Sequence, residues 1–248
     1  MRRIFVILGM LAIVAGISVL AYQYRAHLPV RIAEPLGLRA DISDIRSKQV
    51  PLLTRAFAQH GLAFGAPVFL RIFKEESVLE LWVENDGTFN LFKTYPICHF
   101  SGDLGPKLRE GDGQSPEGIY HVPKSALNPN SSFHLSFNLG FPNAFDQSLG
   151  RTGSFLMVHG NCVSIGCYAM TDPLIEEIYV LVEAALAHGQ DRVPVHAFPF
   201  RLTESRIKEA AQSPWHGFWQ DLQPIYQAFE STKKVPTVSI KDQKYHLN

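Results

Sequence analysis

The sequence predicts a mainly β fold with α additions. Apolar and polar side chains alternate through residues 68–73, 79–84 and 88–93, and a period of two is typical of strands because successive side chains point to opposite faces. Asn85-Asp86-Gly87 separates the second and third of these segments, and Asp-Gly in that position is typical of a tight hairpin turn. Helical spacing is found nearer the two ends of the chain. We therefore expect a β meander inside a domain that is flanked by helices.

Residues 1–25 are expected to be a signal peptide or an N-terminal membrane anchor. Arg2 and Arg3 precede the uncharged residues 4–24, which as a helix would rise roughly 31 Å, about the thickness of a bilayer core. The small residues around Val19-Leu20-Ala21 favour cleavage, whereas the length of the apolar run favours a retained anchor. In both cases the basic flank stays inside and the remaining chain is exported.

Residues 26–62 and 203–248 are expected to flank the central domain. The first part joins a linker rich in Pro and Arg to a helix over 41–60, which Pro51 is expected to interrupt. The second part has helical spacing near 204–211 and 215–229, followed by a short hairpin within 235–247.

Residues 63–202 are expected to form the β-rich central domain. Further strands are predicted at 118–122, 133–139, 155–158 and 193–200, and long loops rich in Gly, Pro, Asn and Ser separate them. Such loops on a β scaffold are usually functional, so we expect them to line a substrate cleft. Thr171 or Asp172 is expected to cap a helix that ends at Gly189.

Composition narrows the classes of partner. With 248 residues and 46% hydrophobic content the chain can bury a full core. Lys plus Arg and Asp plus Glu balance at 23 each, so no overall positive field attracts nucleic acid, and no nucleic-acid partner is expected. Cys98, Cys162 and Cys167 are an odd number of thiols for an oxidising compartment, so at least one stays free or pairs outside the chain.

Residues 155–170 contain the parts of a thiol active site. His159 ends an apolar strand, Gly160 turns the chain, and Cys167 follows a small polar loop and precedes the predicted helix. A cysteine nucleophile needs a base and backbone amides that stabilise an oxyanion. We expect Cys167 as nucleophile, His159 as base, and the amides of Gly166 and Cys167 as oxyanion donors. The alternative for Cys167 is a buried structural cysteine.

Cys162 allows three interpretations. It is a resolving thiol that forms a reversible disulfide with Cys167, an ordinary loop residue, or a metal ligand together with His159, Cys167 and Met170. The metal interpretation ranks last because all its ligands come from one short stretch. No metal or other cofactor is predicted.

The same residues carry a family resemblance. His159-Gly160 followed by Ser164-Ile165-Gly166-Cys167 resembles the signature of the YkuD-type L,D-transpeptidases, cysteine enzymes of bacterial peptidoglycan, and the continuation Tyr168-Ala169-Met170 is similar to the YafK-like branch. The similarity extends through residues 100–107 and 111–118 to about residue 202. It implies an L,D-transpeptidase-like β sandwich or barrel as catalytic domain and a periplasmic or otherwise exported enzyme, anchored to the inner membrane by residues 4–24 if these are retained.

The resemblance also implies a reaction. His159, oriented by a backbone carbonyl near Gly160, activates Cys167 to attack the L-centre carbonyl of diaminopimelate in a stem peptide and form a thioester. Water then gives an amidase, whereas an amine gives cross-links or protein-wall links. Ile165 stands where the family more often has a basic or polar residue, which favours hydrolysis, including release of murein-linked lipoprotein.

Supporting residues and rival classes complete the expectations. Ser164 either donates to the oxyanion or ties down the loop, and Tyr168 either shapes the pocket or packs. Lys107, Arg109 and Arg151 are candidates for binding substrate carboxylates, each with a solvated-surface alternative. Two rival classes are a non-catalytic wall-binding module and a periplasmic thiol-redox or metal-binding protein.

Overall fold

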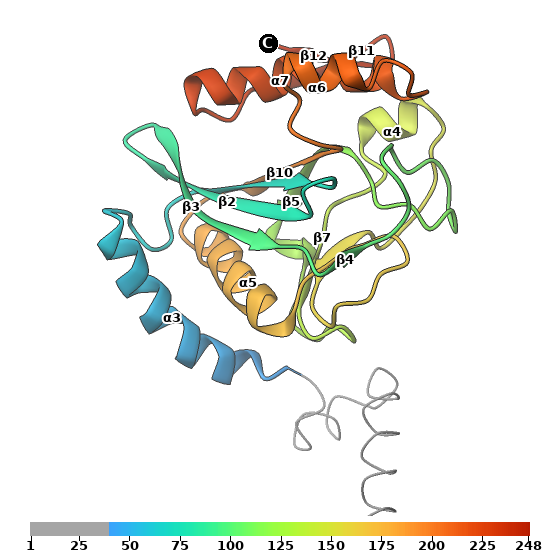
Figure 1. Ribbon diagram of the computed structural model, residues 1–248. Helices are drawn as coiled ribbons and strands as arrows, with labels where there is room; N and C mark the ends of the chain where they lie inside the picture. The colour runs from blue at the N-terminus through green and yellow to red at the C-terminus, as the bar shows by residue number, and fades with distance from the viewer. Residues whose placement is uncertain (1–39) are drawn as a thin grey trace, which may run out of the picture.

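A computed structural model describes residues 40–248, so the predictions for residues 1–25 lie outside the described residues. Two five-stranded sheets form its centre (Figure 1). The first runs in the order β3 (Thr88–Pro96), β2 (Val78–Asn85), β1 (Val68–Phe73), β10 (Arg192–Phe198) and β5 (Gly118–Pro123). The second runs in the order β4 (His99–Phe100), β9 (Tyr168–Ala169), β8 (Met157–His159), β7 (Ser136–Asn138) and β6 (Leu127–Asn128). The mainly β fold with α additions is thereby confirmed.

The first sheet is built as its sequence pattern predicts. β2 and β3 form the hairpin around Asp86-Gly87, and both of these residues have positive φ values, as the tight turn requires. β1 lies in the middle of the sheet, antiparallel to β2 and parallel to β10, and all its side chains are buried. Five of its six residues are apolar, as a position covered on both faces favours, and the sixth, Arg71, is buried in an ion pair with Glu230 at 2.6 Å.

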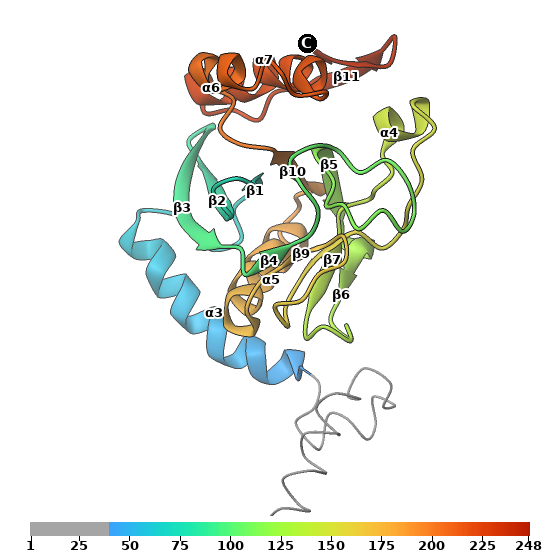
Figure 2. The same ribbon diagram turned by 45° about the vertical axis from the view of Figure 1, so that its right-hand side comes forward.

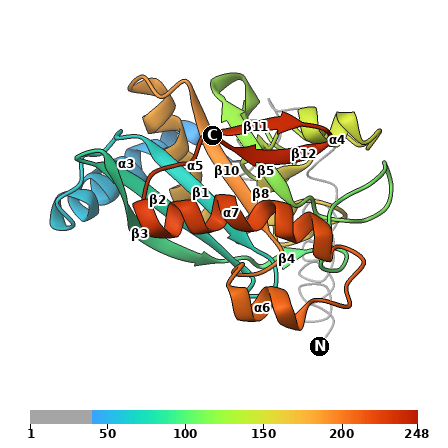
Figure 3. The same ribbon diagram turned by 90° about the horizontal axis from the view of Figure 1, so that it is seen from above.

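Helices cover both faces of this sheet (Figures 1 and 2). Helix α5 (Asp172–Ala187) packs on the face that also contacts the second sheet, and α3 (Ile42–Gln59) packs outside α5. The opposite face carries α6 (Glu204–Glu209), α7 (His216–Thr232) and the hairpin of β11 (Val238–Lys241) and β12 (Lys244–Leu247). Figure 3 shows α7 lying across the strands of the sheet. The C-terminal extension is therefore packed on the β domain.

Two details differ from the predictions. Pro51 does not interrupt α3, because its ring lies on the exposed side while Ile45, Leu53 and Phe57 hold the helix on the core. The strand predicted over 133–139 contracts to β7, and the segment before it is irregular. Five further short elements were not predicted: α4 (Ala144–Ser148), the 3-10 turn Lys124–Ala126, β4, β6 and β9. None of the helices within residues 40–248 combines the length and apolarity needed to span a bilayer.

Candidate active site

The parallel pairing of β8 with β9 brings His159 and Cys167 together. Val158 pairs with Tyr168 and His159 with Ala169, so Cys167 lies beside Met157, whose amide donates to the Cys167 Sγ at 3.4 Å. Residues two apart on a strand face the same side. His159 is therefore the diagonal neighbour of Cys167 on one face of the second sheet.

Both side chains line one cavity of about 480 Å³. Its wall is mostly apolar, and its three most exposed hydrophobic side chains are Phe155 at 72%, Val163 at 52% and Ile165 at 91%. We call these three residues the apolar rim. Phe155 also has a positive φ of 55°, which is unfavourable for an aromatic residue and is found mainly where function requires it.

The tautomer of His159 follows from its hydrogen bond. Its Nδ1 lies 2.5 Å from the carbonyl oxygen of Gly160, and because a carbonyl oxygen only accepts, Nδ1 carries the proton. Nε2 is then left as an acceptor. Burial lowers the pKa of His159, against the opposing effects of the Gly160 carbonyl and the Asp172 charge. The resting imidazole is neutral and suited to act as a base.

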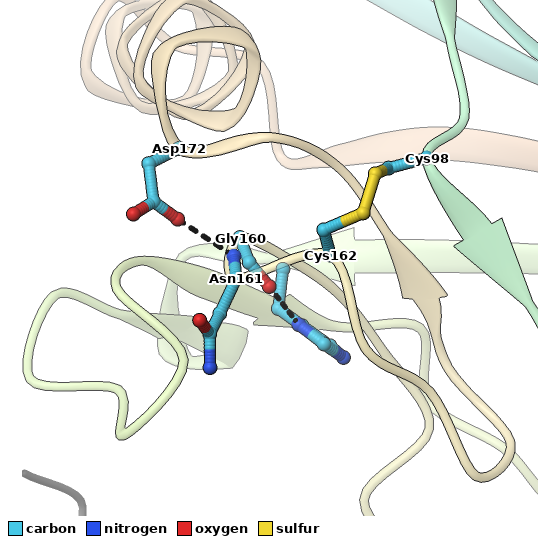
Figure 4. Close-up of a disulfide and its surroundings, with 6 residues drawn as sticks. Cys98, Gly160, Asn161, Cys162 and Asp172 are labelled. Carbon is cyan, nitrogen blue, oxygen red and sulfur yellow. Dashed lines mark hydrogen bonds between the residues drawn. A yellow bond between two sulfur atoms is a disulfide. The ribbon is translucent and has the colours of Figure 1, made fainter. Parts of the chain in front are cut away.

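Asp172 fixes the turn that follows His159. Its Oδ1 accepts the amide of Asn161 at 2.6 Å (Figure 4), and a Cβ added to Gly160 would come within 2.6 Å of the same oxygen. Thr171, without a side-chain hydrogen bond, is the N-cap of α5. Thr171 is thus the cap that was expected at Thr171 or Asp172, and the Asp172 carboxylate instead holds the Gly160–Asn161 peptide.

Cys167 is the free cysteine among the described residues. Burial raises the pKa of its thiol, while the Met157 amide and the Lys107 charge act in the opposite direction. With a raised thiol pKa and a lowered imidazole pKa, the resting pair is neutral.

Two serine hydroxyls hold the main chain at Cys167. Ser164 Oγ donates to the Cys167 carbonyl at 2.7 Å and accepts from the Gly166 amide at 3.1 Å, so Ser164 ties down the loop and the Gly166 amide is already used. This corrects the expectation that Gly166 donates to an oxyanion. Ser115 Oγ donates to the same carbonyl at 2.9 Å. Sequence reasoning included Ser115 in the similar segment 111–118 but gave it no role, because it lies 52 residues from Cys167.

Cys162 is bonded to Cys98, and this bond replaces the disulfide with Cys167 that was one of the three interpretations of Cys162. Figure 4 shows this disulfide beside Gly160 and Asn161. Cys98 directly precedes β4, and its amide donates to Ala169 O of β9. The bond therefore links the entry of the second sheet to the loop after His159. It also removes Cys162 from the suggested metal set, and residues 40–248 contain no cluster of three His, Cys, Asp or Glu side chains arranged to hold a metal.

Of the four predicted binding residues, one lines the cavity and three do not. Lys107 lines the cavity, but its Nζ is buried and already bound to Asp112 Oδ1 at 2.5 Å. The Arg109 side chain is exposed and lies outside the cavity lining. Arg151 is buried in an ion pair with Asp146 at 2.8 Å, which replaces its predicted contact with substrate. Tyr168 is fully buried and donates to Pro116 O at 2.6 Å, so it packs and does not line the cavity.

Residues absent from the predicted site also shape it. Glu110 lines the cavity and accepts from Ser154 Oγ at 3.2 Å. The Phe133 ring lies 4.8 Å from the His159 imidazole. Phe133 lies outside β7, so the spacing of hydrophobic residues in the sequence could not show whether its ring lines a cleft or packs in the core.

Comparison with known proteins assigns the chain to a protein family. The chain is 48% identical over 181 residues, 73% of its length, to the Escherichia coli K12 protein named "Putative L,D-transpeptidase YafK", covering 74% of that protein, and equally to its counterpart in E. coli O157:H7. The chain therefore belongs to the L,D-transpeptidase family, and this membership indicates an exported enzyme. Its similarity within that family is to the YafK-like branch, as the signature at His159 and Cys167 indicated.

Similarity to solved structures is lower. The helical cell shape determining protein Pgp2 of Campylobacter jejuni is 16% identical, with a TM-score of 0.43 over 75% of this chain and 79% of that chain. Bd1075 of Bdellovibrio bacteriovorus is 18% identical, with a TM-score of 0.37 over 67% of this chain and 57% of that chain. No family model matches the chain.

Proposed function

We propose that this protein is a cysteine-dependent acyl-transfer enzyme of peptidoglycan, with Cys167 as nucleophile and His159 as general base. One observation carries the proposal. The Cys167 thiol and the His159 imidazole lie on neighbouring strands and line one cavity, and the Gly160 carbonyl leaves His159 Nε2 free to accept a proton. A nucleophile, a base and a group that orients the base are the minimal set for this chemistry.

The reaction starts from the neutral pair. His159 Nε2 takes the thiol proton as Cys167 Sγ bonds to the carbonyl carbon at the L-centre of diaminopimelate. The oxyanion that forms is stabilised by the Cys167 amide. Collapse breaks the carbon–nitrogen bond, and the imidazolium returns its proton to the leaving amine, which leaves a thioester on Cys167.

The second half of the reaction regenerates the thiol. His159 deprotonates water or an acceptor amine, which attacks the thioester carbonyl, and the proton returns to the departing sulfur. Water gives hydrolysis and an amine gives transpeptidation.

The apolar rim favours release of wall-linked protein. Stem peptides are short and polar, whereas Phe155, Val163 and Ile165 offer exposed hydrophobic contact area beside Cys167. A polypeptide attached through a lysine side chain, such as murein-linked lipoprotein, can bring apolar side chains to this rim. We therefore favour hydrolysis, with formation of cross-links or protein-wall links as the alternative.

The domain assignment forms part of the proposal. Residues 63–202 supply the cavity and both reacting groups, residues 26–62 join it to the N-terminal segment, and residues 203–248 are an extension. Export is directed by residues 1–25, with residues 4–24 as an inner-membrane anchor if they are retained.

The test uses two substrates. The full chain is incubated with murein that carries bound lipoprotein, and separately with free tetrapeptide stems, while released protein and new cross-links are both measured. We expect release of protein, a mass adduct on Cys167 in trapped intermediates, and complete loss in Cys167→Ala. New cross-links without release would reject hydrolysis. Activity retained in Cys167→Ala would reject the cysteine mechanism. It would favour the alternative that the protein is a non-catalytic wall-binding module.

A further inference from the structure

We propose that Trp219 of the C-terminal extension is a positioning residue for Cys167. It acts through Glu117 and the two residues before it, Ser115 and Pro116. This inference rests on the proposed function, because it assigns part of the catalytic geometry to a helix on the far side of the first sheet. Residues 203–248 would then belong to the working enzyme, although none of them lines the cavity around Cys167.

Glu117 is the centre of the connection. Its carboxylate is fully buried, and its two oxygens serve three parts of the chain. Oε2 accepts the indole Nε1–H of Trp219 at 2.9 Å. Oε1 accepts the Gly105 amide at 2.6 Å and the Lys74 ammonium at 3.0 Å. A buried carboxylate with this set of donors has one well-defined position.

The same contacts fix the loop that leads into the cavity. Lys74 Nζ also donates to the carbonyl oxygens of Asp103 at 3.0 Å and Gly105 at 2.9 Å. Gly105 has no room for a side chain, because a Cβ there would collide with the Trp215 indole just before α7. Lys107, whose charge acts on the Cys167 thiol, lies only two residues further along. The N-terminal end of α7 therefore packs directly on the base of this loop.

Two hydrogen bonds continue from Glu117 to the nucleophile. The preceding residue, Pro116, accepts the Tyr168 hydroxyl at 2.6 Å through its carbonyl oxygen. Ser115, one residue earlier, donates to the Cys167 carbonyl at 2.9 Å. Residues 115–117 thus lie between Trp219 on one side and Cys167-Tyr168 on the other. A shift of Glu117 moves the hydroxyl that holds Cys167.

The expected consequence is kinetic. Trp219→Phe keeps an aromatic ring against Phe200 but removes the N–H that holds Glu117 Oε2. Small displacements of reacting groups reduce turnover strongly, so we expect kcat to fall about tenfold, with KM changed by less than about twofold. The loss falls on kcat because the cavity wall itself is untouched.

Trp82 provides a matched control. Its Nε1 also donates to a buried carboxylate, Glu80 Oε2, at the same 2.9 Å, and its ring also packs on an aromatic residue of α7, Phe229. It lies on β2 and has no hydrogen bond to the segment 115–117. Trp82→Phe therefore removes the same kind of bond without touching the connection to Cys167.

The experiment compares the two full-chain variants with the wild type at a temperature where all three are folded by circular dichroism. Turnover on lipoprotein-bearing murein is measured beside the rate of Cys167 alkylation by iodoacetamide, which needs no substrate. For Trp219→Phe we expect lower kcat and an alkylation rate changed by about threefold or more, since thiol reactivity follows its surroundings. For Trp82→Phe we expect both to equal the wild type. Equal effects in both variants, or wild-type values in Trp219→Phe, would overturn the proposal.

A double-variant comparison locates the path. If Trp219 acts through Ser115, Trp219→Phe should add little to the loss in Ser115→Ala, whereas independent effects would multiply and would overturn this path. Failure of the proposed function remains distinguishable. A wild type without activity on any murein substrate would reject the reaction, while the alkylation rates would still decide whether Trp219 positions Cys167.

Discussion

The two sheets are built in different ways. The first has strands of six to nine residues joined by long ladders, with one register shift at Leu81/Trp82 between β2 and β3. The second has strands of only two or three residues, and His134, Phe155, Asn161 and Cys162, all with positive φ values, lie in its connecting segments. Backbone ladders hold the first sheet. Side-chain hydrogen bonds and a disulfide hold the second, which carries the reacting groups.

This difference separates stability from catalytic geometry. Long strands bury continuous apolar area, which is the main source of folding free energy. Short strands leave loops free to adopt the unusual backbone conformations that a reactive site needs. Substitutions in the first sheet should therefore affect unfolding, and substitutions in the second should affect turnover.

The largest expected difference concerns His159. Replacing a general base typically costs about 10²- to 10⁴-fold in rate, so His159→Gln should lower kcat by that factor while the melting temperature changes little. The matched variant in the first sheet is Leu81→Ala, which should cost about 2–5 kcal/mol of unfolding free energy and leave kcat of the folded fraction unchanged. Thermal melts and steady-state rates measured on both variants check the contrast. A His159→Gln enzyme with wild-type kcat would contradict it.

A smaller effect on turnover is expected from the disulfide. Cys98 and Cys162 close a loop with a sequence separation of 64 residues, for which the chain-entropy account gives a stabilisation of roughly 4 kcal/mol. Cys98→Ser with Cys162→Ser should lose stability of that order, and kcat should also fall because the loop after His159 is released. Denaturant unfolding and rate measurements test this. Unchanged kcat in the folded double variant would show that Asp172 alone holds the loop.

The smallest expected effect is on the pH dependence. Only neutral His159 can accept a proton, and burial lowers the pKa of that imidazole, so activity should persist below the usual histidine range and decline as pH falls through the lowered pKa. Burial raises the pKa of Cys167, so its alkylation rate should still be increasing above the usual thiol range. Rate profiles for turnover and for alkylation check both directions. Alkylation that is fast and constant from acidic pH would instead indicate a thiolate–imidazolium pair.

Local patterns predicted the first sheet better than the second. Alternation and the Asp86-Gly87 turn specify β2 and β3 because both depend on neighbouring residues. The parallel pairing of β8 and β9 was not predictable in this way, since strands of three and two residues have no measurable period. The signature nevertheless drew attention to His159 and Cys167, which line one cavity, because a sequence motif does not depend on strand length.

Contacts between distant segments account for what the sequence did not predict. Cys98 and Cys162 come together only because β4 pairs with β9, and Ser115 reaches Cys167 across a loop with no periodic pattern. Arg151 looked available for a carboxylate because Asp146, its buried partner, carries no signal of burial in the sequence. Pro51 was misjudged for a related reason, since tertiary packing outweighs its cost in α3.

The cysteine arrangement has a consequence for maturation. Three thiols permit three single disulfides, and only the Cys98–Cys162 bond leaves Cys167 reduced. The other two pairings each consume the thiol that we assign to catalysis. Under the proposed mechanism, a chain that forms either of these bonds in an oxidising compartment would be inactive until disulfide exchange restores the Cys98–Cys162 bond.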